Sequence, residues 1–243
     1  MLTLDLDRLG ISAGEVVLDL GCGNGRHTFA ALKLGAHVIA VDLETAVLAH
    51  VDEWVEAMRS EGEISGQTSF LPIVGDARHL PLPDESIDHV IVSEVLEHIY
   101  EDDAAIAEVA RILKPGAGAG VTVPRFWPER VCWALSERYR TTVGGHVRIY
   151  TEAALKDKLH GNGLDVVGRS HAHSFHSPYW WLKCAFGDDG TAPVPRLYHR
   201  FLVWQITKQP PLLDTLERAL DPLLGKSLVL YTRKNGVTGH LVG

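Results

Sequence analysis

The chain has 243 residues, 46% of them hydrophobic, and a formal net charge of −8. This length and apolar content suffice for a single α/β domain with insertions, which we expect to span residues 1–243. The negative charge argues against a nucleic acid held through its phosphates. Apolar runs stay shorter than the roughly 18 residues of a membrane span, and the first residues lack the pattern of a secretory signal. Three scattered cysteines fit a reducing compartment, so we expect a cytoplasmic protein without membrane insertion.

Strand and helix patterns alternate along the chain. Short apolar runs predict strands, and longer amphipathic stretches predict the helices between them. The expected strands are residues 16–20, 38–42, 70–74, 86–93, 119–123, 164–168 and 227–232. The expected helices follow the first strand to about residue 34 and then cover 45–60, 102–113, 126–140 and 152–160. This alternation is typical of a parallel sheet covered by helices on both faces.

The first predicted strand runs directly into a glycine-rich turn, Gly21-Cys22-Gly23-Asn24-Gly25. Glycines adopt positive φ and let the backbone approach a ligand closely, and the following helix offers unpaired N–H groups. Asp42 ends the next strand, where a carboxylate can accept both hydroxyls of a ribose. An NAD-linked oxidoreductase uses the same acid, but its G-x-G-x-x-G fingerprint would need a glycine at Arg26. The pattern therefore predicts a nucleoside pocket whose glycine spacing disfavours NAD.

Further segments complete a family pattern. Between Val16 and Val123 the chain reads V-L-D-L-G-C-G-N-G, V-I-A-V-D, G-D-A-x-x-L-P, I-D-x-V-x-x-S-E-V-L-E-H and R-I-L-K-P-G. In this order the segments resemble the class I S-adenosylmethionine (SAM) dependent methyltransferases, in particular the ubiquinone/menaquinone-type small-molecule branch. The resemblance implies an α/β, Rossmann-like sheet of seven strands with helices on both faces. It also implies a last strand that enters antiparallel, next to the sixth.

The same resemblance implies which residues hold SAM. The three glycines of the turn would pack under the methionine and the ribose, while Asp19 would fix the turn or the amino group. Asp42 would take the ribose hydroxyls, and Asp76 would accept from the adenine amino group. Leu43 would lie against the adenine, the Ala77 backbone beside it, and Ser93 would hold the amino-acid part. The expected cofactor residues are Asp19, Gly21, Gly23, Asn24, Gly25, Asp42, Leu43, Asp76, Ala77 and Ser93.

The segment S-E-V-L-E-H-I, which begins at Ser93, carries a candidate metal site. If the chain turns into a helix there, Glu94, Glu97 and His98 share one face. His146 could supply a fourth ligand. The arrangement resembles the metal-dependent 2′-O-methyltransferases that act on small-RNA ends and the quinone-pathway O-methyltransferases. Oxygen-rich ligation favours Mg²⁺ or Mn²⁺ and two histidines leave Zn²⁺ open; the ion would lower the pKa of an acceptor hydroxyl.

Two other interpretations of this segment stay open. In one, His146 is a general base that takes the proton of the acceptor with no ion present. In the other, Glu97 satisfies backbone N–H groups and His98 packs under the cofactor, because E-V-L-E-H is common in members of this branch not known to need a metal. The candidate catalytic residues are accordingly His146 and His98.

Residues 170–226 form an insertion where the family needs only a hairpin. It contains His171, His173 and His176, followed by the aromatic run S-P-Y-W-W-L-K. Aromatic rings stack on sugar or quinone faces, which favours a substrate lid, but they are also enriched at dimer interfaces. Alternate spacing puts His171 and His173 on one face of a strand. The apolar stripe over residues 210–224 is expected in the core or in an interface.

These patterns favour an enzyme that transfers the methyl group of SAM to a hydroxyl of a small molecule by in-line displacement. H-V-R-I-Y-T and S-P-Y-W-W-L-K resemble segments of actinobacterial methyltransferases of polysaccharide or natural-product pathways. The histidines and tryptophans of the insertion favour a sugar over a phenol or quinol. The alternatives are a quinone or phenol O- or C-methyltransferase without metal, and a non-catalytic SAM-binding scaffold. The insertion could form the interface of a homodimer as well as, or in place of, a substrate lid.

Overall fold

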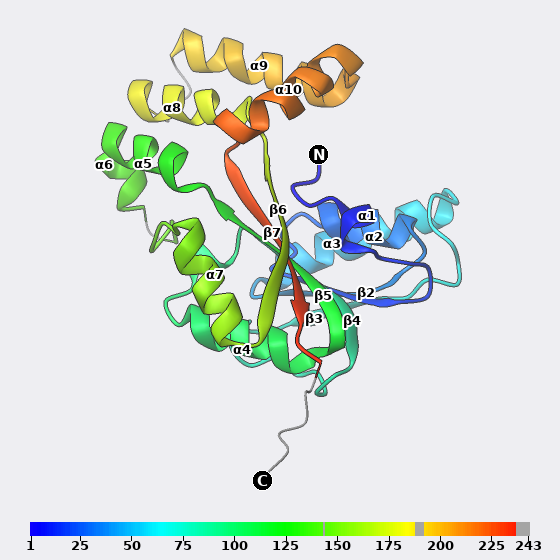
Figure 1. Ribbon diagram of the computed structural model, residues 1–243. Helices are drawn as coiled ribbons and strands as arrows, with labels where there is room; N and C mark the ends of the chain where they lie inside the picture. The colour runs from blue at the N-terminus through cyan, green and yellow to red at the C-terminus, as the bar shows by residue number, and fades with distance from the viewer. Residues whose placement is uncertain (143, 188–191, 237–243) are drawn as a thin grey trace.

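A single seven-stranded sheet organises the molecule (Figure 1). The computed structural model describes residues 1–142, 144–187 and 192–236. The strands are β1 (Val16–Leu20), β2 (His37–Asp42), β3 (Phe70–Val74), β4 (Ile87–Ser93), β5 (Leu113–Pro124), β6 (Leu164–Ala172) and β7 (Ser227–Lys234). Their order is β3-β2-β1-β4-β5-β7-β6, with β7 antiparallel to both neighbours and the other pairs parallel. The predicted Rossmann-like fold, with its antiparallel last strand beside β6, is confirmed.

Helices cover both faces of the sheet. On one face lie α1 (Leu6–Leu9), α2 (Arg26–Lys33) and α3 (Thr45–Ser60); on the other lie α4 (Asp102–Ile112) and α7 (Glu152–Gly161) (Figure 1). Successive side chains of a strand point to opposite faces. On β1, Val17 therefore joins the core under α2 and α3, and Leu18 joins the core under α4 and α7. Both cores consist of buried apolar side chains, which pack closely against the strands that carry the site.

Three predicted elements differ most in extent from the structure. The fifth strand begins at Leu113, because pairing with Ile87 of β4 draws the segment after α4 into the sheet. The sixth strand continues to Ala172, because β7 pairs with it as far as Ser227. The helix expected over 126–140 is two helices, α5 (Phe126–Leu135) and α6 (Glu137–Arg140). Ser136 between them is extended and accepts the Tyr139 N–H as an N-cap.

The predicted insertion folds into three helices after β6, namely α8 (His176–Phe186), α9 (Pro193–Lys208) and α10 (Pro211–Leu224). We call these three helices the cap. They gather beyond the ends of β6 and β7, and α8 packs against α5 (Figure 1). Residues 188–191 of the predicted insertion lie outside the described residues. Within the described part of the chain, every helix is too short or too polar to cross a bilayer.

Candidate active site

A cavity of about 390 Å³ lies at the carboxyl ends of β1, β2 and β4. In open α/β sheets this edge is where nucleotide ligands bind. Of the expected cofactor residues, the cavity wall includes Gly21, Asp42, Leu43, Asp76 and Ala77. Glu94 and His98 complete one side of the same wall, so the cavity continues toward the candidate metal ligands.

The turn between β1 and α2 explains its glycines. Gly21, Gly23 and Gly25 all have left-handed φ, at 67°, 50° and 75°. A Cβ on Gly21 would lie 2.5 Å from Val95 Cγ2, and one on Gly25 would lie 2.8 Å from Phe29 Cζ. A Cβ on Gly23 would meet nothing within 4 Å, so this position leaves open space above the turn. Asn24 is exposed at the turn and does not line the cavity.

Two carboxylates hold this turn in place. Asp42 Oδ2 accepts the Gly23 N–H at 3.1 Å, and its Oδ1 accepts the Glu44 N–H at 3.1 Å, so the carboxylate stands at the mouth of the cavity. Asp19 is buried, accepts the Thr28 hydroxyl at 2.7 Å and lines no part of the cavity. Burial raises the pKa of Asp19 to about 6. Of the two roles implied for Asp19, fixing the turn is the one that these contacts support.

The other two expected cofactor contacts are already engaged within the protein. Asp76 forms an ion pair with Arg78, whose Nη2 and Nε lie 2.6 Å and 3.1 Å from Asp76 Oδ2. Hydrogen bonds from Arg78 lower the pKa of Asp76 to about 2, and Arg78 also reaches Glu101 at 2.6 Å. Ser93 Oγ lies 3.1 Å from Thr122 Oγ1 and accepts from Arg26 at 3.3 Å. The sequence pattern did not indicate Arg78, which lines the cavity beside Asp76.

The predicted helical face of Glu94, Glu97 and His98 does not form. The chain turns after β4 through a short 3₁₀ turn, η1 (Leu96–His98), and Glu94 itself has a left-handed φ of 58°. The Glu94 carboxylate points to β5 and β7: it accepts the Thr122 hydroxyl at 3.0 Å and lies 3.9 Å from Lys226 Nζ. Glu94 is therefore not one of the side chains that cluster as possible metal ligands, which are Glu97, His98 and His146; we call these three the ligand group. The prediction that Glu94 is a fourth ligand is corrected.

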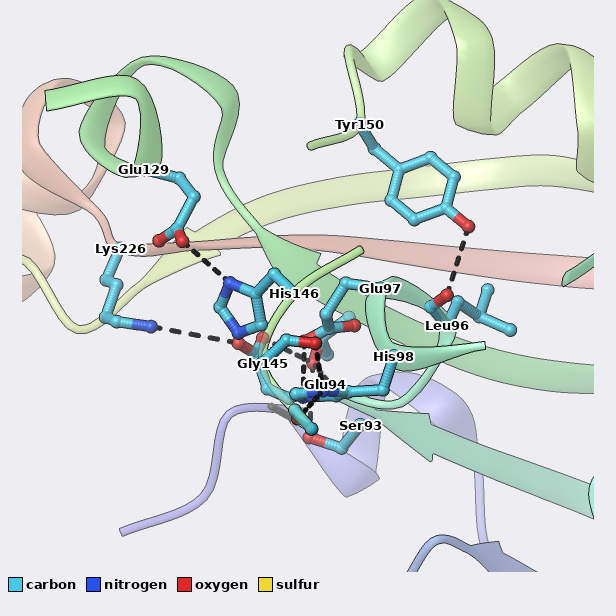
Figure 2. Close-up of polar contacts among 12 residues, drawn as sticks. Ser93, Glu94, Leu96, Glu97, His98, Glu129, Gly145, His146, Tyr150 and Lys226 are labelled. Carbon is cyan, nitrogen blue, oxygen red and sulfur yellow. Dashed lines mark hydrogen bonds and ion pairs between the residues drawn. The ribbon is translucent and has the colours of Figure 1, made fainter. Parts of the chain in front are cut away.

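The other three predicted ligands do converge (Figure 2). Glu97, His98 and His146 each place one potential ligand atom within 4.8 Å of the others, and the two imidazole rings are 4.9 Å apart. The Val147 N–H bonds to the Glu97 carbonyl at 2.8 Å, which holds the segment around His146 against η1. Residues 49 positions apart are thus brought to one point by the loop that precedes α7.

Hydrogen bonds fix the orientation of both imidazoles. His98 Nδ1 lies 3.0 Å from the Gly144 carbonyl, and His146 Nδ1 lies 2.7 Å from Glu129 Oε1 (Figure 2). With Nδ1 donating in each ring, Nε2 carries the free lone pair, which is the arrangement found in metal-ligating histidines. Burial disfavours ionisation of Glu129, but its bond with His146 and the nearby positive charges bring the pKa below its usual value. Sequence reasoning missed Glu129 and Lys226, since neither belongs to a local pattern.

Glu97 has the most unusual environment in the site. Only 1% of its surface is exposed, and neither carboxylate oxygen has a hydrogen-bond partner among the described residues. Burial, together with the nearby charge of Glu94, raises the pKa of Glu97 well above its ordinary value. A buried carboxyl without partners is costly. It is stabilised by a proton or by a cation, and the two free Nε2 atoms beside it suit a cation.

Known proteins share this fold and these motifs. Residues 18–119 match the family model of a methyltransferase domain. Methyltransferase GfsG of Streptomyces halstedii is 38% identical over 172 residues, which is 66% of this chain and 56% of that protein. The demethylmenaquinone methyltransferase of Thermobifida fusca is 36% identical over 104 residues, which is 43% of this chain and 41% of that protein. The chain thus spans about half the length of these curated relatives.

Solved structures agree in fold at low identity. A SAM-dependent methyltransferase from Mesorhizobium loti has a TM-score of 0.58 at 17% identity, covering 94% of this chain and 96% of its own. The [4+2]-cyclase SpnF has a TM-score of 0.61 at 21% identity, covering 95% of this chain and 78% of its own. A cyclase on this fold shows that the fold alone does not specify the reaction. The family match, joined to the glycine turn and the acids beside it, is more specific: residues 18–119 of this chain are similar to a methyltransferase domain.

Proposed function

We propose that the protein transfers the methyl group of SAM to a hydroxyl of a small molecule, with a divalent cation held by Glu97, His98 and His146. The observation that carries this proposal is the buried Glu97 carboxylate, which has no hydrogen-bond partner among the described residues and faces two oriented imidazoles. His98 also lines the cofactor cavity. The ligand group therefore adjoins the place where the SAM methyl would lie.

The chemistry expected of this site is an in-line displacement. The acceptor oxygen attacks the methyl carbon, the carbon–sulfur bond breaks, and S-adenosylhomocysteine leaves. A bound cation would hold the acceptor oxygen and lower the pKa of its hydroxyl. Without Glu94 the donor set is two imidazole nitrogens and one carboxylate, which suits Mn²⁺ or Zn²⁺ better than Mg²⁺. Glu94 instead accepts the Thr122 hydroxyl and lies near Lys226.

A second candidate keeps the methyl transfer and omits the cation. The pairing of Glu129 with His146 Nδ1 at 2.7 Å leaves His146 Nε2 free, and the buried carboxylate would stabilise the imidazolium. In this version His146 Nε2 takes the acceptor proton as the methyl is transferred. His98 then positions His146 through the ring contact.

The cap is the proposed wall of the acceptor site. Tyr139 meets His146 edge-on at 6.1 Å between ring centroids, and Trp180 of the cap lies 5.8 Å from Tyr139. Aromatic walls suit the faces of ring-shaped acceptors, which supports a sugar or glycoside as the preferred substrate class and a phenol or quinol as the next. Among the relatives is also a sterol 24-C-methyltransferase of Gibberella zeae, 28% identical over 76% of this chain and 45% of that protein. Transfer to carbon is therefore an outcome that the assay must detect.

The test is methyl transfer from labelled SAM to glycosides, phenols and quinols, each with Mg²⁺, Mn²⁺ or Zn²⁺ and with a chelator. We expect turnover on a glycoside that the chelator abolishes and Mn²⁺ or Zn²⁺ restores. Glu97→Gln should lose this turnover and still bind S-adenosylhomocysteine, whereas Glu137→Gln, an exposed acid on α6, should match the unaltered protein.

Three results would change the proposal. Turnover that ignores the chelator and survives in Glu97→Gln but not in His146→Ala would establish the general-base version. Full activity of His146→Ala would contradict both versions. Cofactor binding with no turnover on any acceptor would indicate a SAM-binding scaffold. Light scattering would then detect the homodimer that the scaffold hypothesis predicts.

A further inference from the structure

A second group of ligand-type side chains lies where the cap joins the sheet. His173 follows the end of β6, His176 begins α8, and Glu217 lies in the middle of α10. One potential ligand atom of each residue lies within 4.8 Å of those of the other two. Figure 1 shows α8 and α10 meeting near the ends of β6 and β7. This group shares no residue with the group around Glu97 and stands independently of the proposed function.

The backbone positions these three side chains. His173 has a left-handed φ of 68°, which turns the chain sharply, and the His176 N–H bonds to the His173 carbonyl at 3.0 Å. The two imidazole rings are consequently 5.2 Å apart. Ser174 fastens α10 to this turn, because its hydroxyl donates to the Glu217 carbonyl at 2.9 Å and its N–H to Asp221 Oδ1 at 2.8 Å. The arrangement is therefore built by local contacts on both sides.

Each of the three residues has one buried polar atom without a partner among the described residues. These atoms are His173 Nδ1, His176 Nδ1 and Glu217 Oε1. Three such atoms in one place are unusual, because buried polar groups in folded proteins nearly always find partners. One shared partner that accepts lone pairs from all three would remove the deficit.

Hydrogen bonds from neighbouring side chains hold two of the three, His173 and Glu217, as outer-shell groups hold metal ligands. His173 Nε2 lies 3.1 Å from the Thr3 hydroxyl, and donation there leaves the lone pair on Nδ1. Glu217 Oε2 accepts the Gln205 side-chain N–H at 2.8 Å, which leaves Oε1 free. Outer-shell bonds of this type orient metal ligands and are worth 10- to 100-fold in affinity.

The protonation states also suit a cation. Burial lowers the pKa of His176 to about 4 and that of His173 well below its usual value, so both imidazoles are neutral at physiological pH. Burial raises the pKa of Glu217 to about 7, so its proton is easily displaced. The charged groups nearby are of both signs: Lys226, Arg26 and the N-terminal amine act on His176, and Asp221 and Asp214 act on Glu217.

We infer that His173, His176 and Glu217 bind Zn²⁺ and that this ion fastens the cap to the sheet. Two imidazole nitrogens and one carboxylate oxygen are a donor set that Zn²⁺ accepts, with a fourth position left for water. The ion would tie together the end of β6, the start of α8 and the middle of α10. Binding to the folded state alone would also stabilise the fold.

The test uses the full chain carrying Glu97→Gln, stripped with a chelator, so that the other ligand group cannot contribute. Zn²⁺ is titrated against this protein, and Co²⁺ replaces it for visible absorption spectroscopy. We expect one Zn²⁺ per chain, a tetrahedral Co²⁺ spectrum and a rise in melting temperature on metal addition. His176→Ala added to this background should weaken Zn²⁺ binding by about 100-fold or more and remove the rise in melting temperature.

Two further variants keep the inference falsifiable. Glu217→Gln retains an oxygen for Gln205 and a similar shape, so it should fold and still lose affinity for Zn²⁺. His171→Ala, two residues away on β6 and outside the group, should bind as the background protein does. Equal Zn²⁺ affinity in the background, His176→Ala and Glu217→Gln proteins would overturn the inference, as would failure of the background protein to bind Zn²⁺. Neither result bears on the Glu97 group, because that group is already disabled.

Discussion

Glu97 is the residue whose surroundings are hardest to explain without a ligand. Its neighbour in sequence, His98, and its neighbour in space, His146, both turn a free nitrogen toward the same region, while Glu94 turns away to Thr122. Single side chains thus decide whether the site holds a cation, because moving one carboxylate changes both the charge and the donor count of the group. Burial magnifies the difference, since an unpaired charge costs far more there than at the surface.

Asp42 is the corresponding residue on the cofactor side of the site. Its two oxygens hold the backbone at Gly23 and Glu44, and both retain a second lone pair that the expected ribose contacts would use. We expect Asp42→Ala to weaken S-adenosylhomocysteine binding by roughly 10- to 100-fold, because hydrogen bonds to a charged group are worth about 1.5–3 kcal/mol. Calorimetric titration measures this, with Asp52→Ala on the exposed side of α3 as the control. Equal affinities in the two variants would remove Asp42 from the cofactor site.

At the level of elements, the turn from β1 to α2 combines two constraints that glycine alone satisfies. Gly21 and Gly23 both have left-handed φ, but only a side chain at Gly21 would collide with Val95. Val95 follows β4, so the turn of one strand is packed against the exit of another. This close packing fixes Val95, and the short turn with Glu97 and His98 that follows it, relative to the wall of the cofactor cavity.

The two glycines should therefore differ in stability when replaced. Gly23→Ala should cost about 1–2 kcal/mol from the left-handed backbone, and Gly21→Ala should cost about 1–3 kcal/mol more from the collision with Val95. Urea unfolding of both variants gives the comparison. Val95→Ala should recover part of the loss in Gly21→Ala and none in Gly23→Ala; additive effects in both pairs would show that the collision is relieved by other movements.

The whole molecule divides into a sheet that carries the expected cofactor residues and a cap that we propose as the wall of the acceptor site. The cofactor cavity is lined entirely by residues between Leu20 and Glu101, whereas Trp180 of α8 stands against Tyr139 beside His146. Substrate selectivity and cofactor binding can therefore vary separately, as expected when function is carried by segments added to a common fold.

Trp180→Ala tests this division. We expect the KM of the acceptor found in the substrate panel to rise by about 10-fold, as for the loss of an aromatic wall worth about 1.5 kcal/mol, while affinity for S-adenosylhomocysteine stays unchanged. Trp54→Ala, an exposed tryptophan on α3, should change neither quantity. If the acceptor KM stays the same and light scattering instead shows a dimer that separates, the cap is an interface and not a lid.

Local sequence was sufficient for much of the sheet and of the cofactor turn. The turn at Gly21, Gly23 and Gly25 and the place of Asp42 at the end of β2 were predicted correctly, because steric limits on φ and the alternation of apolar residues act within a few positions. The pairing of β5 to Leu113 and of β6 to Ala172 was missed, because strand length depends on what the neighbouring strand offers. Ser136 likewise ends α5 through a cap that periodicity does not reveal.

The sequence by itself determined the fold class, the methyltransferase motifs and the presence of Glu97 next to His98. Only the tertiary structure decided that Glu94 leaves the ligand group and that Glu129 orients His146. It likewise brought Glu217 to the two histidines that follow β6. The physical reason is the range of the interactions. Backbone sterics and periodicity are set by adjacent residues, but the donor count and charge of a buried site depend on side chains that meet only after distant segments have packed together.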